Sequence, residues 1–103
     1  MATLLDDEAI TTALGTLDGW TRDDSDGPAL VRTVELASFP QAIQAVNRIA
    51  EIAENDDHHP DIDIRWRTLT LRCSTHSAGG ITAADVSLAA EIDGVVDTLR
   101  AAD

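Results

Sequence analysis

The chain has 103 residues and a formal net charge of −12 at pH 7, with seven arginines and no lysine. Its length suits one domain over residues 1–103, since domains typically run from about 50 to 200 residues. Binding to a phosphate backbone needs clustered cations, so the charge argues against nucleic acid as a partner. No apolar run approaches the roughly 18 residues of a membrane span, and a single cysteine fits a reducing compartment. We expect a soluble, cytoplasmic protein that contacts no membrane.

The first predicted element is a helix from Asp6 to Leu17. Apolar residues recur there at helical spacing, and three acidic residues stand at the end where the helix dipole favours negative charge. We expect Gly19 to end this helix. Two short strands follow, the second over residues 29–36, and a segment rich in turn formers joins them. Arg32 shares the apolar face of the second strand, so either its stem is buried or the strand lies at an edge.

A second helix is predicted from Ser38 to about Glu54. Serine is a good N-cap, Pro40 suits the first turn, and Gln41 stands at the reciprocal capping-box position. The end of this helix delivers the chain into a pair of histidines, where a rigid scaffold often presents functional side chains. Its predicted apolar face consists of Phe39, Ile43, Val46, Ile49, Ala50 and Ala53.

Alternating apolar residues before and after residues 67–68 predict a β-hairpin with a two-residue turn. In that register Trp66 faces Leu69 and Ile62 faces Cys73, so one face of the hairpin is apolar. Neither turn residue is the Gly or Asn that such turns prefer, and a bulged or longer connection also fits. The hairpin would bring the segment before its first strand beside the segment after its second.

A last helix opens at Thr82, which forms a Thr-x-x-Asp capping box with Asp85 after a glycine-rich turn. Its apolar stripe runs from Val86 to Leu99. The order of elements is helix, two strands, helix, two strands, helix. This order predicts an α+β fold with a four-stranded antiparallel sheet and three helices packed on one face.

The three histidines are the adjacent His58 and His59 and the single His76, 17 positions after His59. Two adjacent rings cannot point the same way on a regular element, so we expect different roles for them. Glu54 lies one helical turn before His58 and could orient an imidazole. An ordinary histidine pKa of about 6.5 suits proton transfer near neutrality. We interpret the histidines as an acid/base site, which the capping carboxylate of Asp85 could also face.

Other interpretations stay open. Any one histidine could be an ordinary surface or core residue, and three imidazoles could bind zinc with one position left for water. An adjacent pair suits one tetrahedral ion poorly and the spacing matches no usual metal motif, so we predict no metal. Cys73 lies in an apolar alternation and is expected to be a buried thiol rather than a nucleophile. Arg65, Arg67 and Arg72 are expected to pair with nearby aspartates rather than bind an anion.

Taken together, these residues resemble the signature of the pterin-4a-carbinolamine dehydratases. The resemblance spans nearly the whole chain, and the double histidine-proline with a spaced Thr-His is its specific part. It implies a four-stranded sheet with helices on one side, assembled through sheet edges into homodimers or homotetramers. The matching residues are Gly19-Trp20, Phe39, Glu54-x-x-x-His58-His59-Pro60, Trp66, Ser74-Thr75-His76, Gly79-Gly80 and Asp85.

The resemblance also implies an activity, the dehydration of 4a-hydroxytetrahydropterin to quinonoid dihydropterin and water, in the recycling of tetrahydropterin. No metal or organic cofactor is implied. A general acid would protonate the departing 4a-hydroxyl and a base would take the N5 proton, and the assignment of these roles stays open. By position, the family's catalytic places fall on His58, His59 and His76, with Glu54 and Asp85 as supporting carboxylates. The positions expected to contact the pterin are Asp57, Ser74, Thr75 and Trp20.

One residue departs from the family pattern. Family members often carry arginine just before the aspartate that aligns with Asp85, and here the residue is Ala84. This change predicts a lower affinity for pterin or a different substrate. The alternative function is a protein-binding or assembly module of the same fold with weak or no dehydratase activity. Retention of all three histidines argues against a purely structural role.

Overall fold

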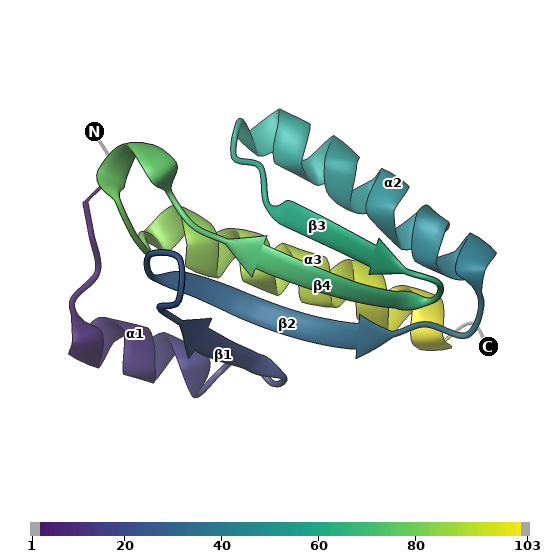
Figure 1. Ribbon diagram of the computed structural model, residues 1–103, viewed down its shortest axis with the longest axis horizontal. Helices are drawn as coiled ribbons and strands as arrows, with labels where there is room; N and C mark the ends of the chain where they lie inside the picture. The colour runs from purple at the N-terminus through teal and green to yellow at the C-terminus, as the bar shows by residue number, and fades with distance from the viewer. Residues whose placement is uncertain (1–2, 102–103) are drawn as a thin grey trace.

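The computed structural model of the protein describes residues 3–101. Within this range, no helix combines the length and the apolar character that crossing a membrane would need. The chain follows the predicted order of helices and strands (Figure 1). The elements are α1 (Asp7–Leu14), β1 (Trp20–Asp23), β2 (Ala29–Glu35), α2 (Phe39–Asp56), β3 (Asp61–Arg65), β4 (Thr68–Cys73), the short 3₁₀ helix η1 (His76–Ala78) and α3 (Ala83–Ala101).

The four strands form one antiparallel sheet in the order β1-β2-β4-β3. In the central pair, Leu30 lies opposite Cys73 and its side chain is buried with that of its partner. Thr33 and Thr70 face the other side, where their exposed hydroxyls lie 3.1 Å apart. The apolar side of the sheet contributes to one core with residues of all three α-helices, and α3 contacts both central strands. The helices therefore cover one face of the sheet, as predicted.

Helix α1 is shorter than its apolar spacing predicts. The Asp6 side chain caps its start by accepting the Ala9 N–H at 2.8 Å. At the other end the Gly15 N–H contacts the carbonyl oxygens of both Thr11 and Thr12 at 3.2 Å, so the last turn tightens there. The prediction that the helix extends to Leu17 and is ended by Gly19 is therefore wrong. Leu17 is buried nonetheless, because the chain after the helix still lies against the core.

Helix α2 begins as predicted. The Ser38 hydroxyl accepts the Gln41 N–H at 3.1 Å. Phe39, however, is 49% exposed, so its predicted place on the buried face is wrong. Ala42 and Ala45 are buried instead, because their small side chains let α2 lie close against α3. The face that contacts the core is therefore rotated toward these alanines.

The hairpin of β3 and β4 has a different register from the predicted one. Ile62 pairs with Leu71 and Ile64 with Leu69, which leaves Trp66 in the turn. Trp66 takes a left-handed backbone (φ 57°), which a two-residue turn of this kind requires. Trp66 is 70% exposed, and the centroid of its ring lies 4.6 Å from the Arg67 guanidinium carbon. The apolar alternation is placed on the predicted face, but the turn begins one residue earlier.

Arg32 has its stem buried within a central strand, which decides between the two predicted alternatives. Its Nη1 lies 2.5 Å from Asp93 Oδ1 on α3, and Trp20 Nε1 donates to the same oxygen at 2.7 Å. This partly buried carboxylate joins β1, β2 and α3. Two of the hairpin arginines pair with aspartates as expected, Arg65 with Asp63 and Arg72 with Asp23, whereas Arg67 pairs with Glu35 instead.

Cys73 should be unreactive in the folded protein. Its thiol is buried, and burial, assisted by the negative charges of Asp85, Asp61 and Asp93, raises its pKa to about 12. Because the thiolate is the reacting form, we expect almost no labelling by a thiol reagent near neutral pH and complete labelling in denaturant. Mass spectrometry of timed samples measures this. Rapid stoichiometric labelling of the native protein would contradict the prediction.

Candidate active site

The centre of the candidate site is a contact between His58 and Asp85. His58 lies between α2 and β3, and its Nε2 is 2.5 Å from Asp85 Oδ1 in the first turn of α3. The Asp85 side chain is completely buried, whereas that of His58 is 16% exposed. A buried charge is unfavourable unless it is paired and hydrogen-bonded. This contact therefore both satisfies the carboxylate and fixes the orientation of the imidazole.

The second oxygen of Asp85 is held by two threonines. Asp85 Oδ2 accepts the Thr82 main-chain N–H at 2.9 Å, the carboxylate half of the predicted capping box. It also accepts the Thr75 hydroxyl at 2.8 Å. Thr75 follows β4 and His58 precedes β3, so the hairpin does bring these two segments together around Asp85.

His59 makes a separate contact on the exposed side. Its Nε2 lies 2.8 Å from Glu54 Oε1, and the His59 side chain is 57% exposed. The helical spacing suggested His58 as the partner of Glu54, and the structure pairs Glu54 with His59 instead. The reason is Asp57, which ends α2 in a left-handed conformation (φ 50°, ψ 42°), so the i,i+4 relation no longer holds beyond it. The adjacent imidazoles thus have different carboxylate partners and different exposure, as expected.

His76 begins η1 and is exposed. The turn that carries it is built on Thr75, whose carbonyl oxygen accepts the N–H groups of Ala78, Gly79 and Gly80 at 2.9 to 3.3 Å. Ser74, the preceding residue, donates its hydroxyl to the Pro28 carbonyl oxygen at 3.1 Å. His76 directly follows Thr75 in the chain. The Thr75 hydroxyl donates to Asp85, the same carboxylate that contacts His58. A single cavity shared by all three imidazoles stays a prediction.

Trp20 does not fit the substrate contact predicted for it. The side chain is only 5% exposed, and its indole N–H is bonded to Asp93. Asp93 lies eight residues after Asp85 on α3, or about 12 Å along the helix axis. The structure therefore places Trp20 in the core, away from the contact between His58 and Asp85.

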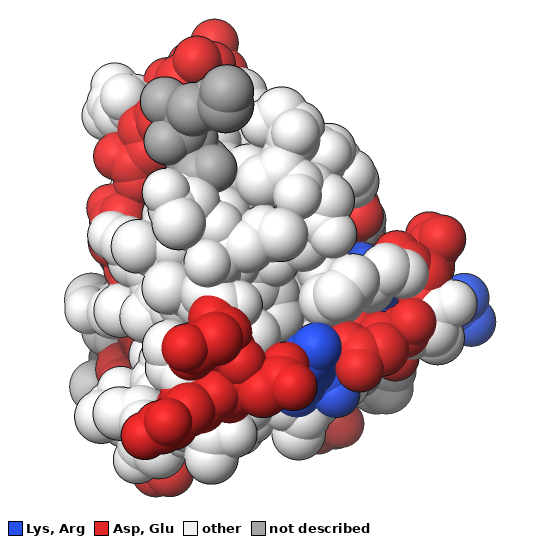
Figure 2. All heavy atoms as spheres, turned by 90° about the vertical axis from the view of Figure 1, so that its left-hand side faces the viewer, with Lys and Arg blue, Asp and Glu red and all other residues white. Residues whose placement is uncertain are grey.

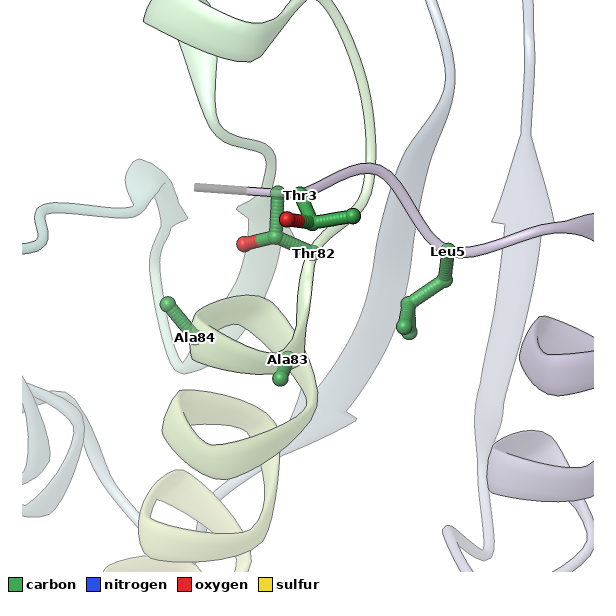
Figure 3. Close-up of a pocket in the computed structure, with 5 residues that line it drawn as sticks. All are labelled: Thr3, Leu5, Thr82, Ala83 and Ala84. Atoms are coloured by element: carbon green, nitrogen blue, oxygen red, sulfur yellow. The ribbon is translucent and has the colours of Figure 1, made fainter. Parts of the chain in front are cut away.

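A hollow of about 430 Å³ opens at the start of α3 (Figure 3). Its lining is formed by Thr3, Leu5, Thr82, Ala83 and Ala84, none of which is charged. Ala84 directly precedes Asp85, and the Thr82 N–H donates to the Asp85 carboxylate, so the hollow adjoins the candidate site. The position where the family often has arginine here contributes only a methyl group to this lining.

The surface around this end of the molecule separates charged from uncharged areas. Figure 2 shows acidic side chains gathered in a band, broken by basic atoms, below a broad uncharged area. Arg22 forms ion pairs with Asp7 and Asp24, each at 2.8 Å. An uncharged area bordered by acidic residues favours neutral molecules over phosphorylated ones.

No metal site is evident in the part of the chain that the structure describes. Across residues 3–101, no three His, Cys, Asp or Glu side chains are grouped so that they could hold a metal ion. Three imidazoles could in principle bind zinc, but His58 and His59 each contact one carboxylate instead. That the site works by acid/base chemistry without a metal stays a prediction.

Comparison with known proteins identifies the family by sequence. The family model described as pterin 4 alpha carbinolamine dehydratase matches residues 3–95. A Nocardia farcinica protein named "Putative pterin-4-alpha-carbinolamine dehydratase" is 58% identical over 87% of this chain and 92% of its own length. A protein of the same name from Roseiflexus castenholzii is 52% identical over 93% of this chain and its entire own length.

Solved structures agree with the sequence matches. A transcriptional coactivator/pterin dehydratase from Brucella melitensis superposes with a TM-score of 0.87 at 28% identity, over 91% of this chain and 99% of that one. A pterin dehydratase-like RuBisCO assembly factor of the alpha-carboxysome shares the fold, with a TM-score of 0.64 at 19% identity over 76% of this chain and 89% of that one. With the family model covering most of its length, this chain belongs to the pterin 4 alpha carbinolamine dehydratase family.

Proposed function

We propose that the protein dehydrates 4a-hydroxytetrahydropterin to quinonoid dihydropterin and water, using histidines as acid and base. Family membership supports the reaction. The observation that carries the mechanism is the buried carboxylate of Asp85, which two threonines hold while it contacts His58. In a cell that makes tetrahydropterin, the product would be available for reduction back to the cofactor.

His58 is the proposed base. Its Nε2–H faces the Asp85 carboxylate, so the neutral ring carries its lone pair on Nδ1. When Nδ1 takes the N5 proton of the substrate, the imidazolium that forms is stabilised by the adjacent negative charge. The electron pair of the N5–H bond then forms the C4a=N5 double bond as the 4a-hydroxyl leaves. The departing oxygen takes a proton from a general acid and is released as water.

The acid is proposed to come from the exposed part of the site. His59, oriented by Glu54, and His76, on its glycine-capped turn, are the two remaining imidazoles. Both are accessible to solvent and can be protonated again after each turnover. Asp57, Ser74 and Thr75 are proposed to border the pterin ring, with Ser74 and Thr75 contributing main-chain groups, because their hydroxyls are bonded within the protein.

The direct test is the rate of dehydration of 4a-hydroxytetrahydropterin, generated in situ, with the spontaneous rate subtracted. We expect the wild-type protein to accelerate dehydration in proportion to its concentration. His59→Ala and His76→Ala then identify the acid, because the acid-deficient variant loses the limb of the pH profile that requires a protonated group. A rate equal to the spontaneous one would reject the enzyme and leave the protein-binding module as the function.

We further propose that the protein forms a homo-oligomer. Phe39, Ile64 and Trp66 are large apolar side chains that stay exposed. Arg67 contacts the Ala37 carbonyl oxygen at 3.5 Å, which places the hairpin turn near the start of α2. This apolar surface borders β3, an edge strand whose outer main-chain groups have no strand beside them within the described chain. Large exposed apolar side chains near a sheet edge often mark an interface.

Trp66→Ser should weaken this self-association. Because aromatic side chains frequently dominate interface energies, we expect the variant to be smaller than wild type in light scattering at the same concentration. Trp66 is in an exposed turn, so the free energy of unfolding of the isolated chain should change little. Leu4→Ser, at an exposed apolar residue outside this surface, is the control. A wild-type protein that is already monomeric at micromolar concentration would contradict the proposal.

A further inference from the structure

Thr82 makes contacts that a helix cap alone does not explain. It is 2% exposed and directly precedes α3, where a threonine hydroxyl would ordinarily accept a helix N–H. Here the Asp85 N–H bonds the Thr82 carbonyl oxygen at 3.1 Å. The Thr82 hydroxyl oxygen lies 2.7 Å from Thr75 Oγ1 instead. The hydroxyl is therefore directed toward the candidate site.

The number of hydroxyl hydrogens determines which group donates in each hydrogen bond of this network. A hydroxyl has one hydrogen to donate, and Thr75 donates its own to Asp85 Oδ2 at 2.8 Å. In the contact between the two threonines, Thr82 must therefore be the donor and Thr75 the acceptor. The direct approach of Thr82 Oγ1 to Asp85 Oδ2, at 3.5 Å, is too long to compete.

The network divides the Asp85 carboxylate into two halves. Thr82 reaches Oδ2 twice, by its N–H at 2.9 Å and by its hydroxyl through Thr75. This leaves Oδ1 for His58 Nε2. Hydrogen bonds in such a buried chain polarise one another, so each strengthens the next. The orientation of the carboxylate in turn sets which imidazole nitrogen carries the proton.

We propose that Thr82 is a positioning residue for the dehydration, because it fixes Asp85 so that Oδ1 meets His58 Nε2. This inference rests on the proposed function. It gives Thr82 a role in the reaction that neither the histidine motif nor the helix cap predicts. It also assigns the Thr75 hydroxyl to the support of Asp85 rather than to the substrate. Thr82 lines the hollow as well (Figure 3), so positioning and direct substrate contact must be separated by experiment.

The test compares Thr82→Val, which has the same shape without the hydroxyl, with Thr82→Ser, which keeps it. We expect Thr82→Val to lower kcat about tenfold with KM unchanged, as for a small misplacement of a reacting group. The limb of the pH profile that reports the base should move to lower pH, because a loosely held carboxylate stabilises the imidazolium less. Thr82→Ser should restore both. Thr98→Val makes the same change at an exposed position of α3 and should behave as wild type.

Proton NMR provides a readout that does not depend on activity. A hydrogen bond of 2.5 Å from His58 Nε2 to a carboxylate should give a far-downfield N–H resonance. We expect this resonance to move upfield and broaden in Thr82→Val and to persist in Thr82→Ser. If Thr82→Val does not fold, Thr75→Val can replace it. This variant breaks the same series of hydrogen bonds at the next bond, from Thr75 to Asp85, and should give the same changes.

Two results would overturn the inference. One is a Thr82→Val protein with the wild-type kcat, pH profile and resonance. The other is a Thr82→Val protein in which KM is raised and kcat is unchanged. That result would make Thr82 a substrate contact. If the wild-type protein shows no dehydratase activity, the proposed function fails, and the NMR comparison still decides whether Thr82 positions Asp85 and His58.

Discussion

His58→Ala is expected to lower kcat/KM for dehydration by about 10² to 10⁴, the range typical of removing a general base. The effect should fall mainly on kcat, because the imidazole acts on a proton that moves in the transition state. The main-chain bond from the residue 58 N–H to the Ala53 carbonyl oxygen, at 3.0 Å, should remain. The variant nevertheless loses one partner of the buried Asp85 carboxylate, so we expect lower stability and compare rates per folded molecule. Initial rates with the spontaneous reaction subtracted measure the loss.

Two comparisons make this result specific. Added imidazole should restore part of the His58→Ala rate, because it can occupy the space of the missing ring and accept the proton. Asn47→Ala, an exposed change on α2, should keep the full rate. A His58→Ala rate within about twofold of wild type, far from the range for a general base, would show that another residue removes the N5 proton.

Asp85→Ala is expected to have the largest effect on stability. It removes a buried carboxylate and leaves three donors without their acceptor, on His58, Thr75 and Thr82. Breaking a buried pair in this way typically reduces the free energy of unfolding by about 3–5 kcal/mol, of the same order as the whole stability of many small domains. Urea unfolding followed by circular dichroism measures the change. Dehydratase activity should fall as well, even at urea concentrations well below the unfolding transition.

Asp93→Ala is the matched control for Asp85→Ala. Asp93 is on the same helix and also accepts two donors, from Trp20 and Arg32, but it does so at a partly buried position away from the site. We expect this variant to lose stability while the folded fraction keeps its wild-type kcat. Equal losses of activity per folded molecule in both variants would mean that Asp85 acts only through the fold.

The sequence allows the fold to be predicted because local and tertiary preferences agree along most of the chain. Period-2 and period-3.6 patterns place all four strands and the three helices in the correct order. The errors arise where tertiary contacts decide between similar local choices. Phe39 fits an apolar helix face, yet small alanines pack closer to α3. Trp66 continues the alternation of β3, yet the turn needs a residue with positive φ at that position.

The candidate site is only partly predictable from the sequence. The motif and the acid/base chemistry of imidazole single out the three histidines, but pairing depends on side-chain direction. Glu54 contacts His59 because the helix ends at Asp57, a detail of backbone conformation that helical spacing does not encode. The role of Thr82 is hidden for a similar reason, because Thr-x-x-Asp predicts a helix cap and gives no indication that the hydroxyl turns toward Thr75.

The left-handed backbone of Asp57 makes this residue a clean probe of substrate binding. Glycine adopts that conformation more easily than any other residue and is the usual choice at the end of a helix. Asp57→Gly should therefore leave the path of the chain into the histidine pair intact. If Asp57 borders the pterin as proposed, a rise in KM in that variant reports the missing carboxylate rather than a displaced backbone.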